Sequence, residues 1–359
     1  PLNQSTFSFQ TRQLPLDERL RSRLTGGLAR TYDTLRPSGN VNLDVDLSYP
    51  GNGKWRIQNL KVTAHDGAIV PVHFPYRVDH IKGELWQEEP DILNLDFSGM
   101  AGDRPVTAKG NVQHPGPASK MDIDVISYGV PIDASLQAAC PDGIKTILDE
   151  LELQGKLNAH VKLTRAPALN QPIQVDLRAK MDEGGALQYR MFPYRVTDLK
   201  GEVSYSSNTG RVYFSQLQGR HGNAQLSAQG TYDRFDSDGK LRLKVAAQNA
   251  TCDSNLRLAL PDSLQKLWGD LSPTGKLNLT TDISWQRGLP AQISIPQAKW
   301  WNGSLNLKDF PYPIDNLNAQ WSYEVDPGTG NNVVVMKSIS GKHDETRIGI
   351  GDAFGEITP

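Results

Sequence analysis

The sequence predicts a mainly β protein built from three tandem units. Each unit has about seven antiparallel strands and a short helical segment that leads into the next unit. Three observations predict this fold class. One phrase recurs at a fixed interval, apolar and polar residues alternate over long runs, and one kind of amphipathic segment lies between those runs.

The recurring phrase reads FPYRVDHIKGELW from Phe74, FPYRVTDLKGEVSY from Phe192 and FPYPIDNLNAQWSY from Phe310, so successive copies lie 118 residues apart. A fixed period of this length indicates a repeat architecture. A second phrase, which closes on a glycine, keeps the same order and separates the units. We place the end of a preceding unit and its helical segment at 1–38, repeat 1 at 39–154, repeat 2 at 155–274 and a truncated repeat 3 at 275–359. We expect these to be middle units of a longer protein.

The alternating runs predict strands with one apolar and one polar face. VNLDVDLSY (Val41–Tyr49) alternates without a break, and KLNAHVKL and LRLKVAA follow the same pattern in later units. Turn-forming segments such as AGDR and HPGPAS separate these runs. In the first unit the pattern predicts strands near 41–49, 54–64, 68–74, 80–87, 92–100, 104–112 and 120–128.

The phrase that closes each unit predicts helix. Leu16, Leu20, Leu24, Leu28 and Tyr32 are spaced by four, which is typical of one face of a helix. N-cap residues are expected at Asp17, Asp133 and Asp253. Because seven antiparallel strands leave the chain on the edge opposite its entry, we expect the helical segment to cross back over the sheet.

Nearly every predicted strand is apolar on one face only, and two arrangements satisfy this pattern. In one, each unit closes into a β-sandwich domain; in the other, the units form one extended curved sheet whose apolar faces line a groove. No linker rich in Pro, Gly or Ser separates the units, which favours the groove. Its predicted lining includes Val41, Leu43, Val45, Leu47, Leu157, Val161, Leu277 and Leu279.

The recurring phrase itself predicts a structural joint. Its proline fixes a bend between two strands, and its aromatic residues fill the core at that bend. Gly83 and Gly201 indicate a bulge or kink, a place that Ala319 takes in the third copy. The residues that define the joint are Phe74, Pro75, Tyr76, Gly83, Phe192, Pro193, Tyr194, Gly201, Phe310, Pro311 and Tyr312.

Nothing in the sequence indicates catalysis. No hydrolase, P-loop or paired-cysteine motif is present, and no histidine recurs at equivalent positions across all three units. We therefore expect no enzyme activity, no metal and no cofactor. The net charge of −2 gives no reason to expect a nucleic-acid partner. Exposed edge strands at both ends favour end-to-end self-association.

An open apolar groove needs an occupant, and acyl chains fit one. The repeated phrases, each after a glycine-containing turn and before further alternating strands, resemble the repeats of AsmA/TamB-like proteins, a family of bridge-like lipid-transfer proteins. The resemblance covers essentially the whole chain. It implies a periplasmic protein of a diderm bacterium, held in the inner membrane by a segment absent from this chain, that conducts phospholipid between membranes and contacts inner- or outer-membrane proteins at its ends. The alternative is a structural β-repeat rod that acts as a spacer or scaffold in the cell envelope.

Overall fold

The computed structural model describes residues 5–49, 56–234, 239–260, 262–308, 312–325, 332–351 and 356–357. Two compact units make up the chain, and each is described by itself. Unit 1 comprises residues 1–145, 156–179 and 205–208, and unit 2 comprises residues 146–155, 180–204 and 209–359.

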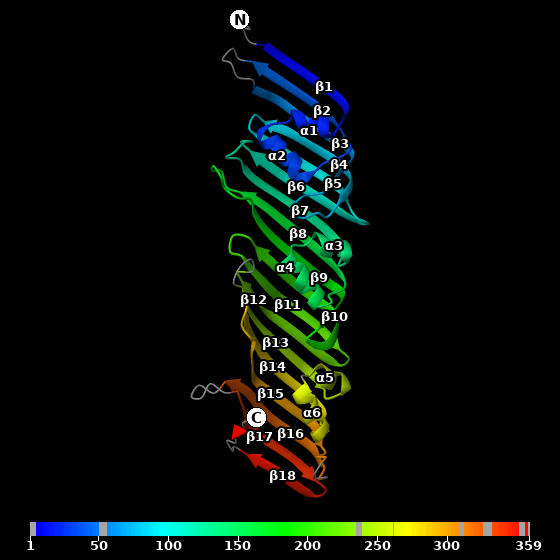
Figure 1. Ribbon diagram of the computed structural model, residues 1–359, viewed down its shortest axis with the longest axis vertical. Coiled ribbons are helices and arrows are strands. Elements are labelled where there is room, and N and C mark those ends of the chain that lie inside the picture. The colour runs from blue at the N-terminus through cyan, green and yellow to red at the C-terminus, as the bar shows by residue number, and fades with distance from the viewer. Residues whose placement is uncertain are drawn as a thin grey trace. The chain divides into compact units, whose positions relative to one another are not determined.

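Unit 1 is an antiparallel meander in which each strand pairs with the next one in the sequence (Figure 1). Its strands are β1 (Ser5–Pro15), β2 (Asn40–Tyr49), β3 (Arg56–Ile69), β4 (Val78–Glu89), β5 (Ile92–Ala101), β6 (Arg104–Gln113), β7 (Lys120–Pro131) and β8 (Lys156–Arg165). Its helices are α1 (Glu18–Arg23), α2 (Gly26–Leu35) and α3 (Ala134–Ala139).

Unit 2 repeats this pairing from strand to strand. Its strands are β11 (Arg211–His221), β12 (Ala224–Asp233), β13 (Lys240–Thr251), β14 (Thr274–Gln286), β15 (Gln292–Leu305), β16 (Ile314–Val325), β17 (Asn332–His343) and β18 (Thr346–Gly351), with β19 (Glu356–Ile357) against β17. Its helices are α5 (Ser254–Ala259) and α6 (Asp262–Leu271). Three further elements have residues in both units: α4 (Asp142–Glu150), β9 (Gln174–Tyr189) and β10 (Phe192–Ser206).

The predicted fold class is confirmed: the protein is mainly β, its strands are antiparallel, and the sheet is open. The alternative of closed sandwich domains is wrong, because strands pair across the predicted repeat boundaries. In unit 1, β1 pairs with β2 and β7 pairs with β8; in unit 2, β13 pairs with β14. Within each of the two compact units, the first strand of a repeat is therefore hydrogen-bonded to the last strand of the repeat before it.

Repeat 1 contributes six strands, β2 to β7, where the pattern predicted about seven. The strand predicted at 54–64 lies largely in β3, which has a bulge between Ala64 and Gly67 and ends at Ile69. Only the first two residues of the strand predicted at 68–74 belong to β3, and residues 70–74 are not in a strand, so this prediction is wrong. His65 and Asp66 therefore lie within this strand. An even number of strands returns the chain to the end from which it started. The helical segment after β7 consequently leads into the antiparallel neighbour β8 and does not cross the sheet.

The helical segments begin as predicted. Asp17, Asp133 and Asp253 each accept a hydrogen bond from the amide three residues later, at 3.0, 2.9 and 3.0 Å. These bonds satisfy amides that the first helical turn leaves without a partner.

Each helical segment also ends in the same way. The chain after β3 donates two backbone hydrogen bonds to the end of α2, from Val70 to Leu35 (3.0 Å) and from Val72 to Thr34 (2.8 Å). The equivalent bonds in unit 2 run from Asn306 to Leu271 (3.0 Å) and from Lys308 to Asp270 (2.9 Å). These bonds hold the end of each helical segment against the connection between the next two strands, β3 and β4 or β15 and β16.

The recurring phrase forms a bulge next to its glycine. His80, Asp198 and Asn316, which are 118 residues apart, all have a φ of 51°. Gly83 follows the first of them with a φ of 141°, and a Cβ atom at Gly83 would lie 2.1 Å from the carbonyl oxygen of Asp96. The backbone of β4 thus approaches β5 more closely than any side chain permits.

We expect Gly83→Ala to lower the free energy of unfolding by about 2 kcal/mol or more, because it adds a clash to a strained φ. Urea denaturation followed by circular dichroism measures this loss. Gly27→Ala in α2 is the control, since no atom lies within 4 Å of its added Cβ and alanine favours helix by up to about 1 kcal/mol. Equal stability of the two variants would contradict the assignment.

Candidate functional site

The apolar side chains of unit 1 form rows that run across the strands. Directly paired residues of antiparallel strands point to the same face, so the register determines which side chains become neighbours. One row consists of Leu43, Val62, Leu85, Leu95, Gly110, Ile123 and Leu163, from β2 to β8. The next row consists of Val41, Ala64, Gly83, Phe97, Ala108, Val125 and Val161. Neither row contains a polar side chain.

This apolar face is covered only near the helices. Val41 and Ala64, at the end of the strands that leads to the helical segments, are each 8% exposed. Phe7, Phe9 and Ile57, toward the other end, are 52%, 54% and 49% exposed. All described strands of unit 1 from β1 to β8 belong to one ladder, so none of them forms a second sheet over this face.

Unit 2 carries rows of the same kind. One consists of Leu226, Ala247, Leu279, Ala298, Trp321 and Met336. Another consists of Ala250, Leu277, Trp300, Ala319, Ile339 and Ile350. Ala224, Ala247 and Ala250 form a small buried cluster, against which three leucines pack.

The residues predicted to line a groove each belong to the apolar face of their own unit. Val41, Leu43, Val45 and Leu47 alternate along β2, and all but Val41 are partly exposed. The other predicted residues are Leu157 and Val161 on β8 and Leu277 and Leu279 on β14, and each is partly exposed. Partial exposure is what a single layer of apolar side chains produces when it has only its own neighbours for cover.

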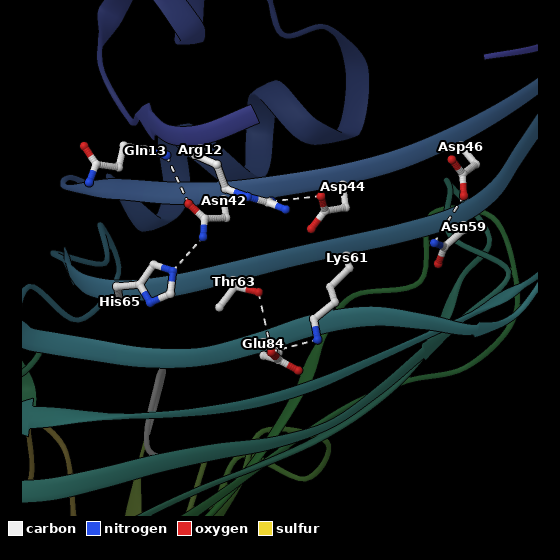
Figure 2. Close-up of polar contacts among 10 residues, drawn as sticks. All are labelled: Arg12, Gln13, Asn42, Asp44, Asp46, Asn59, Lys61, Thr63, His65 and Glu84. Carbon is white, nitrogen blue, oxygen red and sulfur yellow. Dashed lines mark hydrogen bonds and ion pairs between the residues drawn. The ribbon is translucent and has the colours of Figure 1, made fainter. Parts of the chain in front are cut away.

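The opposite face is polar, and its side chains satisfy one another (Figure 2). Arg12 pairs with Asp44 at 2.8 Å, and Lys61 pairs with Glu84 at 2.9 Å. In the same way, hydrogen bonds from His160 and then from Lys162 lower the pKa of Asp124. Cross-strand pairs of this kind hold the strand register from the solvent side.

An asparagine holds a bulge at the end of each strand that precedes a helical segment. Asn42, Asn158 and Asn278 accept hydrogen bonds from the backbone amides of Gln13, Gly129 and Asn249, at 3.0, 2.9 and 2.8 Å. The bulge residues have φ values of 57°, 66° and 57°. Sequence reasoning did not single out these asparagines, although each directly follows the first apolar residue of its strand's alternating run (Val41, Leu157 or Leu277).

The aromatic residues of the recurring phrase divide between two environments. Tyr194 is 7% exposed, whereas Phe74 and Phe192 are 41% and 37% exposed. Tyr194 is therefore a core residue and Tyr76 is partly exposed, whereas the phenylalanines are exposed, which differs from the expectation that both aromatic residues fill the core. Pro75 lies between β3 and β4, and Pro193 is the second residue of β10. Phe310 and Pro311 lie outside the described residues, and Tyr312 is partly exposed.

In unit 2, a histidine stacks on the tyrosine of each of the two copies of the recurring phrase. His221 stacks on Tyr194 with ring centroids 3.8 Å apart, and His343 stacks on Tyr312 at 3.5 Å. The Nδ1 atom of each histidine lies within hydrogen-bond distance of the carbonyl oxygen of the residue after that tyrosine, at 2.7 and 2.8 Å. Both histidines end a strand, β11 or β17; in repeat 1 the corresponding strand β5 ends at Ala101. The recurrence of a histidine in two of the three repeats is the sequence feature that could have indicated this role.

The described residues contain neither a candidate metal centre nor a candidate membrane-spanning helix. No group of three His, Cys, Asp or Glu side chains in that part of the chain is arranged to hold a metal ion. None of the described helices has the length and apolar character needed to cross a bilayer.

Comparison with protein-family models, curated proteins and solved structures found no match to this chain. The fold and its surfaces define the class: an antiparallel β-repeat protein, each unit of which has an apolar face that the described strands leave uncovered away from the helices.

Burial raises the pKa of Tyr194 to about 12, with Asp253 and Cys252 as smaller causes. An unfolded tyrosine releases its proton near pH 10, so this residue's contribution to stability is complete below about pH 10 and is lost as the pH rises toward 12. The loss amounts to about 1.4 kcal/mol for each pH unit in that window.

We expect Tyr194→Phe to remove this pH dependence. Near pH 8 the variant should be at least as stable as the wild type, because the buried hydroxyl has no hydrogen-bond partner among the described residues. Denaturant unfolding of both proteins at pH 8, 10 and 11 gives the comparison. Parallel losses in the two proteins would show that Tyr194 titrates normally.

Proposed function

We propose that the apolar face binds the acyl chains of lipids, and that the protein is a non-enzymatic segment that conducts phospholipid between membranes. The observation that supports this proposal is the pair of uninterrupted apolar rows across β2 to β8, which no described second sheet covers. A soluble surface with contiguous apolar rows of this kind is typical of a site that meets an apolar partner.

The dimensions of the rows suit an acyl chain. Seven strands are separated by six intervals of about 4.8 Å, so a row is roughly 29 Å long. One leaflet of a bilayer contributes roughly 15 Å of hydrocarbon, about half of the bilayer core. An extended acyl chain therefore fits along a row, and each CH₂ group removed from water contributes about 0.8 kcal/mol.

The chemistry of the rows also suits movement. Their side chains are aliphatic, apart from Phe97 and two glycines, so an acyl chain meets similar contacts at each strand. The uncovered face leaves room for a headgroup in water, while the polar face remains engaged in its own ion pairs. A uniform apolar surface binds a chain without a single deep site that would hold it in place.

The resemblance to AsmA/TamB-like repeats supplies the setting for this proposal. It places the protein in the periplasm of a diderm bacterium, anchored to the inner membrane through another segment, with membrane proteins as neighbours at its ends. The repeated phrase that carries the resemblance forms the joints that position the apolar rows.

Site-specific cross-linking tests the binding face. Leu85 and Glu84 are adjacent in β4 and point to opposite faces, so benzoylphenylalanine at each position probes one face only. After irradiation in cells, we expect lipid adducts at position 85 and none at position 84, as detected by mass spectrometry of the intact protein. Equal labelling at the two positions, or no adduct at position 85, would count against the apolar face as the binding site.

A charge in the rows should weaken lipid binding. We expect Leu95→Glu combined with Ala108→Glu to reduce co-purifying phospholipid at least several-fold, because each charge loses hydration under an acyl chain. Asp96→Glu with Lys109→Arg alters the same strands on the polar face and serves as the matched control. Lipid extraction and thin-layer chromatography measure the difference. A folded wild-type protein that carries no lipid would favour the role of a structural spacer instead.

A further inference from the structure

The polar face of unit 2 contains a shallow hollow of about 480 Å³ over β14 to β17. Its polar lining includes Asn278, Trp301, Asn318, Gln320, Ser338 and Ser340. The strand register brings Asn278, Lys299, Gln320 and Ser338 into one row, and Asn318 and Ser340 into the next. Trp301 pairs with Lys276 and so lies on this polar face, opposite to the apolar face that contains Leu277.

Repeat 1 has a smaller hollow of about 380 Å³ at the equivalent positions, but its lining is charged. Lys82, Glu84 and Asp96 contribute to it, and Thr63 and His65 stand beside them on β3. Pairing relates the two sites: Thr63, Glu84 and Asp96 align across β3 to β5 as Lys299, Gln320 and Ser338 align across β15 to β17. Lys82 and Ser98 likewise correspond to Asn318 and Ser340.

The carboxylates of the charged site in repeat 1 pair with lysines of the neighbouring strands. Glu84 pairs with Lys61 at 2.9 Å, and Asn42 lies 2.8 Å from the Nε2 atom of His65 (Figure 2). Asp96 pairs with Lys109 at 2.9 Å. The two carboxylates of this hollow are therefore already engaged in ion pairs.

Repeat 3 does not have the residues that form these ion pairs in repeat 1. Gln320 replaces Glu84, Ser338 replaces Asp96, and Trp301 stands at the position of His65. The side chains of Gln320, Ser338 and Ser340 make no hydrogen bond within the part of the chain that the structure describes. Asn278 uses its carbonyl oxygen to hold the bulge at Asn249, which leaves its amide hydrogens for a ligand.

This combination of groups has a specific chemistry. Free amides and hydroxyls donate to and accept from hydroxyl groups, and an indole ring offers a flat apolar surface with a polar edge. The row from Asn278 to Ser338 crosses four strands, so it spans three intervals of about 4.8 Å, or roughly 14 Å. The lining contains one cation, Lys299, and no carboxylate.

We propose that this hollow is a binding site for a neutral oligosaccharide. The apolar side of a sugar ring stacks on Trp301, and the ring hydroxyls bond to Asn278, Asn318, Gln320 and the two serines. The hollow is also bordered by Trp300 and Ala319 of an apolar row, but the polar side chains that carry the proposal lie on the opposite face, so the proposal does not rest on lipid binding.

Isothermal titration calorimetry of the whole chain with cellotetraose and with chitotetraose tests the proposal. We expect saturable binding of at least one of them, and a loss of affinity of about tenfold or more for Trp301→Ala, the upper range of a lost aromatic stacking contact. Trp86→Ala is the matched control, because Trp86 lies on the polar face beside the charged hollow of repeat 1. It should bind like the wild type.

A second variant keeps the indole and changes only the polar groups. Gln320→Glu with Ser338→Asp installs the residues that repeat 1 already has at these positions, and circular dichroism verifies that the sheet is intact. We expect it to abolish binding. No heat of binding from either tetrasaccharide at millimolar concentration, or binding that survives Trp301→Ala, would overturn the proposal.

Discussion

Backbone hydrogen bonding between consecutive antiparallel strands is the interaction on which each unit depends. The meander from β1 to β8 has no described second sheet behind it, so the ladder itself has to hold the strands in place. The well-buried apolar residues are mostly alanines, and many lie at strand ends near the helical segments, as Ala64, Ala68 and Ala250 do. A conventional thick core is not what stabilises these units.

Several features next to the paired strands fix which residues of neighbouring strands lie opposite each other. Asparagines hold the bulges that precede the helical segments, and paired backbone hydrogen bonds hold the ends of those segments against the following hairpin joint. Gly83 allows one strand to approach the next where a side chain would clash. Ion pairs on the polar face bind neighbouring strands to one another from outside. The apolar face is therefore left free of any structural partner over most of the strand length.

Because side chains alternate along each strand, one face of the sheet is apolar and the other is polar, and the two faces can bind different kinds of molecule. The apolar rows of unit 1 are almost wholly aliphatic from strand to strand, which suits the proposed binding of a mobile acyl chain. The polar face changes from repeat to repeat: Glu84 and Asp96 are ion-paired carboxylates, whereas Gln320 and Ser338 at the equivalent positions are uncharged, with Lys299 as the one cation beside them. Side chains on the polar face point to solvent, and backbone pairing between the strands does not require a particular residue there. The residues at these positions can therefore differ between repeats without disturbing the sheet.

The sequence by itself determined the period, the alternation of faces and the helix starts, because these depend on residues close together in the chain. Asp17 caps a helix through an amide three residues away, and Leu43 and Asp44 face opposite sides whatever lies next to their strand. Strand count was harder to predict, since a bulge at His65 and Asp66 looks like a turn until its pairing with β4 is known. Only the tertiary structure decided that β7 pairs with β8, that Tyr194 is buried while Phe192 is exposed, and that Trp301 lies in one hollow with Asn278, Asn318 and Gln320. The physical reason is that cross-strand contacts join residues 20 to 40 positions apart, as Gln13 and Asn42 or Asp122 and Lys162 are, and local alternation does not specify which strand will be the neighbour.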